Sequence, residues 1–123
     1  MIRVLRQSQP LWVAPDQNTG SRHAVFAPFF GESAATVPTL SRLSKLGHAL
    51  VLPFVQHRLP GLAGYELVIE PALENFPSAD PIADTTRVNQ VIEAAVRRSP
   101  EQYLWTHRRF KTRPPGCPSL YRG

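Results

Sequence analysis

The sequence predicts an α/β fold in which a mixed, partly parallel sheet is flanked by helices, and three patterns indicate it. Short apolar runs predict strands over residues 11–14 and 49–55, and an alternating pattern predicts a half-buried strand over residues 65–69. Apolar residues at helical spacing predict helices over residues 36–46 and 84–98. The order strand, helix, strand, strand, helix is typical of an α/β layer with part of its sheet parallel. A length of 123 residues corresponds to one domain at most.

The first thirty residues are expected to alternate between short elements and loops. Residues 1–7 have the pattern of the end of a helix whose beginning is missing, and Pro10 stops it. Residues 11–14 are apolar and lie between prolines, which is the pattern of a buried parallel strand. Turn-forming residues predict a loop over 16–23. Residues 24–30 are either a short strand or an apolar loop, since a proline within them argues against a central strand.

Cap and turn residues set the expected bounds of the middle elements. Thr36 can cap the first long helix, a proline two residues later is tolerated in its first turn, and Gly47 ends it. Strands 49–55 and 65–69 are joined by a segment with two glycines, which predicts a hairpin connection.

The second long helix follows a loop over residues 74–82. Asp84 is the expected cap, and the helix continues to Arg98 with apolar residues on one face, namely Val88, Val91, Ile92, Ala95 and Val96. Pro100 then opens one or two further helical turns through Trp105. We expect residues 1–113 to belong to one domain and residues 114–123 to form a proline-rich extended tail.

Charge is unevenly distributed along the chain. The formal net charge is +5, and cations concentrate in the last third, at Arg97, Arg98, Arg108, Arg109, Lys111, Arg113 and Arg122. This asymmetry favours an anionic partner, although a solvated surface with a flexible tail is the alternative. No recognised nucleic-acid-binding pattern accompanies the charge, so nucleic acid is not an expected partner. Cys117 is the single cysteine, which excludes an internal disulfide. No stretch is long enough to span a bilayer, and no signal peptide is recognised.

Three groups of residues are candidates for a functional site. Asp16 directly follows an expected buried strand, where ligands bind in open α/β sheets; alternatively it is a turn residue bonding to backbone amides. Arg108, Arg109 and Lys111 could bind phosphates through charge-assisted hydrogen bonds. Alternatively, one arginine of the cluster that extends to Arg113 pairs with an acidic side chain or a helix end, and the others are solvated.

Aromatic residues form the third group. Phe29 and Phe30, with Phe26, could contact an apolar ligand or touch a membrane, and core packing is the alternative. His23 and His107 have no acid at a spacing that would pair with them, so each is expected to be structural or exposed.

Six blocks in order resemble the late acyltransferases of lipid A biosynthesis, the enzymes that add secondary lauroyl or myristoyl chains to the lipid A precursor. They are Leu-Trp-Val-Ala-Pro-Asp-Gln from residue 11, Ala-Val-Phe-Ala-Pro-Phe-Phe-Gly from 24, Ser-Ala-Ala-Thr from 33 with Leu-Ser-Arg-Leu from 40 as one following helix, Val-Leu-Pro-Phe from 51, Gly-Tyr-Glu-Leu-Val-Ile from 64, and the aromatic and basic run from 101 to 114. The resemblance covers nearly the whole chain and is to the C-terminal portion of such an enzyme.

The resemblance implies acyl transfer from acyl carrier protein to a hydroxyl on a hydroxyacyl chain of the anionic lipid A precursor, by general-base catalysis and with no metal or redox cofactor. The family's catalytic pair, a histidine followed five places later by an acid, is absent, since none of the four histidines has an acid at that spacing. Asp16 would then have a supporting role, and the basic run would hold the anionic lipid or the acidic helix of the carrier protein. Phe29 and Phe30 would line the acyl-chain channel. The family often has a second acid two residues after the position of Asp16, where Asn18 stands here. A complete enzyme would act at a membrane surface, on the cytoplasmic face of the bacterial inner membrane.

A second hypothesis is a catalytically inactive product: a truncated fragment, or a module that binds anionic lipid or a partner protein. The missing catalytic pair favours it for this polypeptide taken alone.

Overall fold

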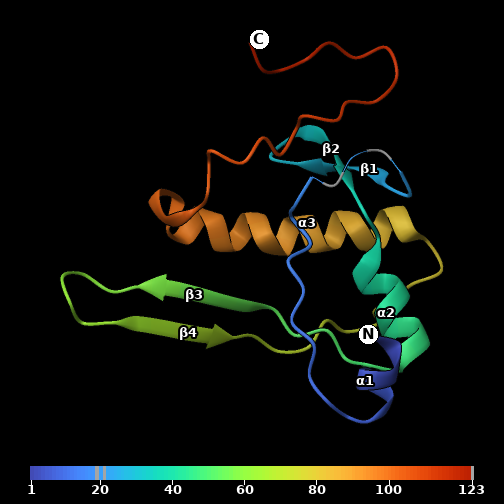
Figure 1. Ribbon diagram of the computed structural model, residues 1–123, viewed down its shortest axis with the longest axis vertical. Helices are drawn as coiled ribbons and strands as arrows, with labels where there is room; N and C mark the ends of the chain where they lie inside the picture. The colour runs from blue at the N-terminus through green and yellow to red at the C-terminus, as the bar shows by residue number, and fades with distance from the viewer. Residues whose placement is uncertain (19, 21, 123) are drawn as a thin grey trace.

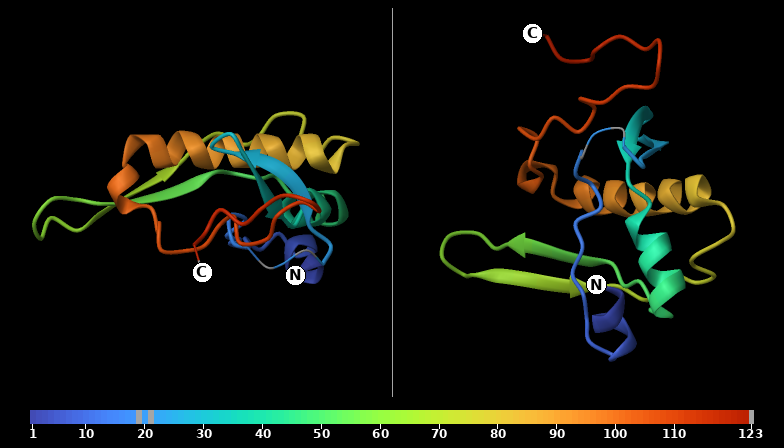
Figure 2. Two further views of the ribbon diagram at one scale, coloured as in Figure 1. Left: turned by 90° about the horizontal axis from the view of Figure 1, so that it is seen from above. Right: turned by 45° about the vertical axis from the view of Figure 1, so that its right-hand side comes forward.

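The computed structural model describes residues 1–18, 20 and 22–122 and shows an α/β fold with two small antiparallel sheets and three helices (Figure 1). The elements are α1 (Ile2–Arg6), β1 (Val25–Phe29), β2 (Glu32–Thr36), α2 (Thr39–Gly47), β3 (Phe54–Arg58), β4 (Tyr65–Ile69), α3 (Pro81–Arg98) and the 3₁₀ turn η1 (Pro100–Gln102). Helix α3 runs through the middle, with the β1–β2 hairpin on one side and the β3–β4 hairpin on the other (Figures 1 and 2).

The β1–β2 hairpin is the centre of the core. Its strands pair from Val25 with Thr36 to Phe29 with Glu32, leaving a two-residue turn. Both turn residues have positive φ, 50° at Phe30 and 81° at Gly31, and turns of this kind match the twist of the flanking strands. The expected helical start over residues 33–36 is therefore wrong, because this stretch pairs with β1 as a strand. The buried apolar residues come mainly from this hairpin, α2 and α3: Ala27, Phe29, Ala34, Ala35, Leu43, Val88 and Val96.

Helix α2 begins at Thr39, three residues later than expected. Thr36 lies buried in β2 and does not cap the helix, whose N-cap is Pro38 with no side-chain hydrogen bond. The helix ends at Gly47, followed by His48 in the left-handed conformation. A Cβ on Gly47 would lie 2.8 Å from Leu5 Cδ1, so the contact of α1 with α2 requires glycine here.

The hairpin expected in the middle of the chain is confirmed. Strand β3 pairs antiparallel with β4 from Phe54 with Ile69 to Arg58 with Tyr65. The first strand starts later than residue 49, because the residues before Phe54 have no regular strand pairing. Leu67 and Ile69 are more than half exposed.

Helix α3 is confirmed, but its cap is not the expected one. Asp80 caps it by accepting hydrogen bonds from the backbone of Ile82, at 2.8 Å, and of Ala83, at 3.3 Å. Asp84 lies one turn further on, 4% exposed, and both its oxygens accept from the Ser78 amide. The last turns expected through Trp105 are shorter, since η1 ends at Gln102.

Residues 11–14 do not form the expected buried strand. They have no strand pairing, and Trp12 is 73% exposed. Both sheets formed by the described residues are antiparallel. Among the described residues, no helix has the length and apolar character needed to cross a membrane.

Candidate functional site

The candidate site forms where the basic segment, residues 103–113, passes back over β2 and over residues 16–18 (Figures 1 and 2). Two parts of the sequence about ninety residues apart are joined there by direct hydrogen bonds. Asp16, a candidate site residue from the sequence, lies within this region together with Arg109 of the expected cationic cluster.

Asp16 is half-buried and contacts Tyr103. The Tyr103 hydroxyl donates a hydrogen bond to Asp16 Oδ2 at 3.2 Å. Burial of the phenol raises the pKa of Tyr103 well above its ordinary value, and the Asp16 carboxylate raises it further. Tyr103 therefore stays protonated and acts as a donor. Sequence reasoning missed this residue, because nothing in the aromatic run around Tyr103 indicates that its hydroxyl bonds to Asp16, 87 positions earlier.

Asn18 joins residues 15–18, here called the Asp16 loop, to the basic segment by several hydrogen bonds. Its Nδ2 donates to the Arg109 carbonyl at 3.2 Å, and its Oδ1 accepts from the Thr112 hydroxyl at 3.0 Å. The same Oδ1 accepts from the Gly20 amide, which closes the loop. The backbone amide of Asn18 donates to His107 Nε2 at 3.0 Å. A carboxylate here would have no N–H for the Arg109 carbonyl, so the amide has a specific structural role.

Arg109 lies inside the molecule, with only 2% of its surface exposed. Its guanidinium donates to the Ala35 carbonyl at 2.7 Å and to the Thr36 hydroxyl at 2.5 Å, and it lies 5.3 Å from the centre of the Phe29 ring. Burial lowers its pKa, while the nearby charge of Asp16 acts in the opposite direction. Phosphate binding by Arg109 stays a prediction. In the structure its guanidinium is hydrogen-bonded to β2 instead.

Arg113 binds the same strand, β2, at an acceptor two residues before Ala35. Its guanidinium donates to the Ser33 carbonyl at 2.9 Å and pairs with Glu32 at 3.1 Å. Carbonyls two residues apart on a strand point the same way, so Arg109 and Arg113 together satisfy acceptors along the edge of β2. The structural alternative expected one arginine bonded within the fold, and the structure has two, Arg109 and Arg113.

Arg108 and Lys111 point outward, in contrast to Arg109. Both are exposed. The Arg108 guanidinium lies 5.6 Å from the centre of the Tyr121 ring, and the Tyr121 hydroxyl accepts a hydrogen bond from the Phe110 amide. The end of the chain thus contacts the basic segment, while both cationic groups remain accessible to a solvent-borne ligand.

The two candidate phenylalanines have different surroundings. Phe29 is 1% exposed and contacts Phe110 and Tyr103 at ring-centre distances of 6.1 and 6.2 Å. Phe30 is half-buried, with Trp105 at 6.1 Å and the Arg97 guanidinium at 4.8 Å. Contact of either ring with an acyl chain stays a prediction.

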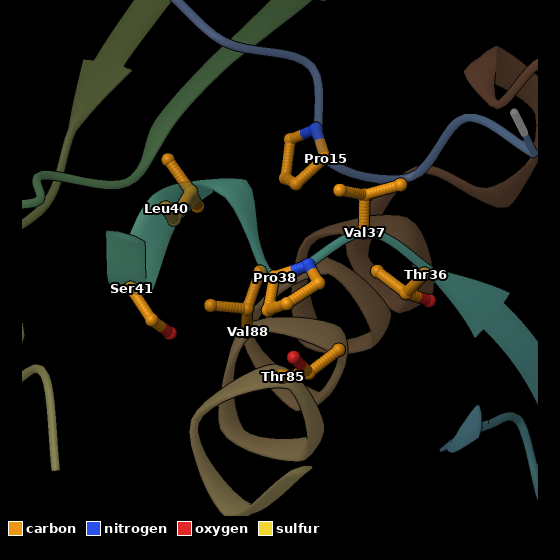
Figure 3. A pocket seen from close by; sticks show the side chains of 8 residues that line it. All are labelled: Pro15, Thr36, Val37, Pro38, Leu40, Ser41, Thr85 and Val88. Atoms are coloured by element: carbon orange, nitrogen blue, oxygen red, sulfur yellow. The ribbon is translucent and has the colours of Figure 1, made fainter. Parts of the chain in front are cut away.

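A small cavity lies between the Asp16 loop, α2 and α3. Figure 3 shows its lining, in which Thr36, Ser41 and Thr85 lie among apolar residues that include Pro15 and Val88. Its volume of about 10 Å³ has room for about one water molecule and none for a fatty acyl chain. Among the described residues, no cluster of histidine, cysteine and acidic side chains could hold a metal ion.

Comparisons with known proteins agree on one family. Residues 1–112 match the family model described as bacterial lipid A biosynthesis acyltransferase. The chain is 41% identical to a lipid A biosynthesis lauroyltransferase and 42% identical to a lipid A biosynthesis palmitoleoyltransferase, both from Escherichia coli K12, with 98% of this chain and 40% of each relative covered. It is 33% identical to a lipid A biosynthesis myristoyltransferase of the same organism, with 94% and 36% covered. The chain thus spans about 40% of the length of these relatives.

Proposed function

Because the chain belongs to the family of bacterial lipid A biosynthesis acyltransferases, we propose that it is the part of such an enzyme that positions the anionic lipid acceptor. The observation that carries the proposal is the match of the family model over residues 1–112, which includes both the Asp16 loop and most of the basic segment. A non-catalytic binding module is not favoured, because the similar proteins are named as acyltransferases.

The proposed reaction moves a fatty acyl group from the thioester of acyl carrier protein to a hydroxyl on a hydroxyacyl chain of the lipid A precursor. A general base takes the proton of the hydroxyl, whose oxygen attacks the thioester carbonyl, and the thiol of the carrier leaves. A histidine and acid pair spaced as the family has it is not among these 123 residues, so the proton-abstracting step is not assigned to this chain. Asp16 is assigned a supporting role beside that step.

Arg108 and Lys111 are the proposed contacts to phosphate. Both are exposed on the basic segment, whereas Arg109 and Arg113 already bond to β2. A guanidinium can meet a phosphate with two parallel hydrogen bonds, and an ammonium adds a compact charge. The two outward cations therefore supply charge and direction while the two inward ones hold the segment in place.

The finer features expected of the complete enzyme remain part of the proposal. It would have a partly parallel sheet, act at a membrane surface on the cytoplasmic face of the inner membrane, and use no metal or redox cofactor. Phe30, half-buried beside Trp105, is a better candidate than Phe29 for touching an acyl chain, because Phe29 is enclosed.

The test is an acyl-transfer assay on the protein expressed from its complete reading frame, with acyl carrier thioester and lipid A precursor. The double variant Arg108→Ala/Lys111→Ala should raise the KM for the lipid by about ten-fold or more, since a hydrogen bond to a charged group contributes about 1.5–3 kcal/mol. Arg42→Ala/Lys45→Ala removes the same charge from exposed positions of α2 and is the matched control. Absence of transfer by the unaltered protein would refute the activity. Equal effects of the two double variants would refute the phosphate contact.

A further inference from the structure

Asp16 accepts a hydrogen bond from a residue distant in the sequence, and that contact uses only one of its two carboxylate oxygens. Tyr103 lies 87 positions away and donates to Oδ2 at 3.2 Å. The described residues donate no hydrogen bond to the other oxygen, Oδ1. A carboxylate fixed at one oxygen has a defined direction at the second, which is how a supporting acid orients a reacting group.

The tyrosine ring is itself held firmly. It meets the Trp105 ring edge to face at 5.0 Å and lies 6.2 Å from the enclosed Phe29 ring. The preceding turn η1 is fixed by Gln102, whose side chain exchanges two hydrogen bonds with the backbone of Arg58 on β3. Tyr103 is therefore a rigid donor attached to two parts of the fold.

Arg109 gives a physical reason for an acidic residue at position 16. A guanidinium that is 2% exposed needs a compensating anion nearby, and Asp16 is the acid whose charge acts on both Arg109 and Tyr103. The pair is not in direct ionic contact, because no salt bridge joins them within 4.0 Å. Asp16 thus receives electrostatic support from Arg109 and a direct hydrogen bond from Tyr103.

We propose that Tyr103 is a positioning residue for the acyl-transfer reaction, which holds Asp16 by Oδ2 so that Oδ1 is directed to the reacting groups. This inference rests on the proposed function, because it needs Asp16 to act beside the transfer step. It assigns to Tyr103 a role that is separate from binding the lipid phosphates.

The experiment is a double-mutant cycle of Tyr103→Phe and Asp16→Asn in the protein expressed from its complete reading frame. Tyr103→Phe removes one oxygen and keeps the ring. It should lower kcat by about ten-fold while both KM values stay within about two-fold, as expected when a hydrogen bond to a charged group is lost. In the Asp16→Asn background the same change should have a much smaller effect on kcat, because the two residues act as one unit. Tyr65→Phe is the matched control and should leave kcat unchanged, since Tyr65 is 62% exposed on β4.

The kcat values and the unfolding free energies of the same variants together distinguish a failure of the positioning role from a failure of the proposed function. If the unaltered protein transfers acyl groups and Tyr103→Phe keeps its full kcat, the positioning role is overturned and the proposed function stands. A fall in kcat that is fully additive with that of Asp16→Asn also overturns it. If the unaltered protein shows no transfer, the proposed function fails and the positioning role with it. A non-additive change in unfolding free energy would then show only that the contact is structural.

Discussion

Replacing Arg109 should damage folding far more than replacing its neighbour Arg108, although the two residues have the same charge and adjoin in sequence. Arg109 is 2% exposed, and its guanidinium makes two hydrogen bonds to β2 at 2.7 and 2.5 Å. Arg109→Ala would leave the Ala35 carbonyl and the Thr36 hydroxyl buried without these donors. Each such group costs about 1–3 kcal/mol, and Asp16 also loses the compensating charge.

The expected loss in unfolding free energy is therefore about 3–5 kcal/mol. For a domain of this size it corresponds to a fall in Tm of roughly 10–20 °C. Arg109→Lys should recover part of the loss, because an ammonium restores the charge and one hydrogen bond but not the fork. Urea unfolding followed by tryptophan fluorescence measures the unfolding free energies of Arg109→Ala and Arg109→Lys. Arg108→Ala is the control.

The control has a clear expectation of its own. Arg108 is exposed, and its contact is with the ring of Tyr121, so Arg108→Ala should change the unfolding free energy by less than about 1 kcal/mol. Equal losses for the two variants would refute the division of the cations into inward and outward groups.

Two further predictions concern the contacts that hold the Asp16 loop. Asn18→Asp should lower the unfolding free energy by about 1–3 kcal/mol, because a carboxylate cannot donate to the Arg109 carbonyl; an unchanged urea midpoint would contradict this. The pKa of Tyr103 is raised in the folded protein, chiefly by burial, so the folded state keeps a proton that the unfolded state loses. Its stability contribution should be fully present below about pH 10, the ordinary pKa of tyrosine, and be lost as the pH rises further. Tyr103→Phe should flatten this alkaline decline in urea unfolding measured from pH 9 to 11.

The regular elements could be predicted where the pattern of the sequence is local. The spacing of Val88 and Val96 marks the buried face of α3, and both residues are 7% exposed. The β3–β4 hairpin follows from an apolar run and an alternating run on either side of a glycine-containing turn. The cap of α3 was misplaced by one turn, because Asp80 and Asp84 are both suitable capping residues and only the tertiary contact of Asp84 with Ser78 distinguishes them.

The elements that were wrong depend on partners elsewhere in the chain. Residues 33–36 all have small side chains, and nothing within the stretch itself opposes a helix. Pairing across the turn at Phe30 and Gly31 makes them a strand, and this requires β1 as a partner. Residues 11–14 have the composition of a buried strand, but no described strand pairs with them, and Trp12 faces solvent. Tertiary pairing decided both cases against the local pattern.

The basic segment shows why a cluster of like charges is a poor guide to its own function. Four cations within six residues suggest one anion-binding surface, yet Arg109 and Arg113 bond to carbonyls of β2 more than seventy positions earlier. No property of the segment itself identifies which side chains turn inward, because the acceptors belong to another element. Charge removal at Arg108 and Lys111 therefore tests anion binding only if the two inward arginines are left intact. A variant that includes Arg109 would lose activity through unfolding and would mimic a defect in substrate binding.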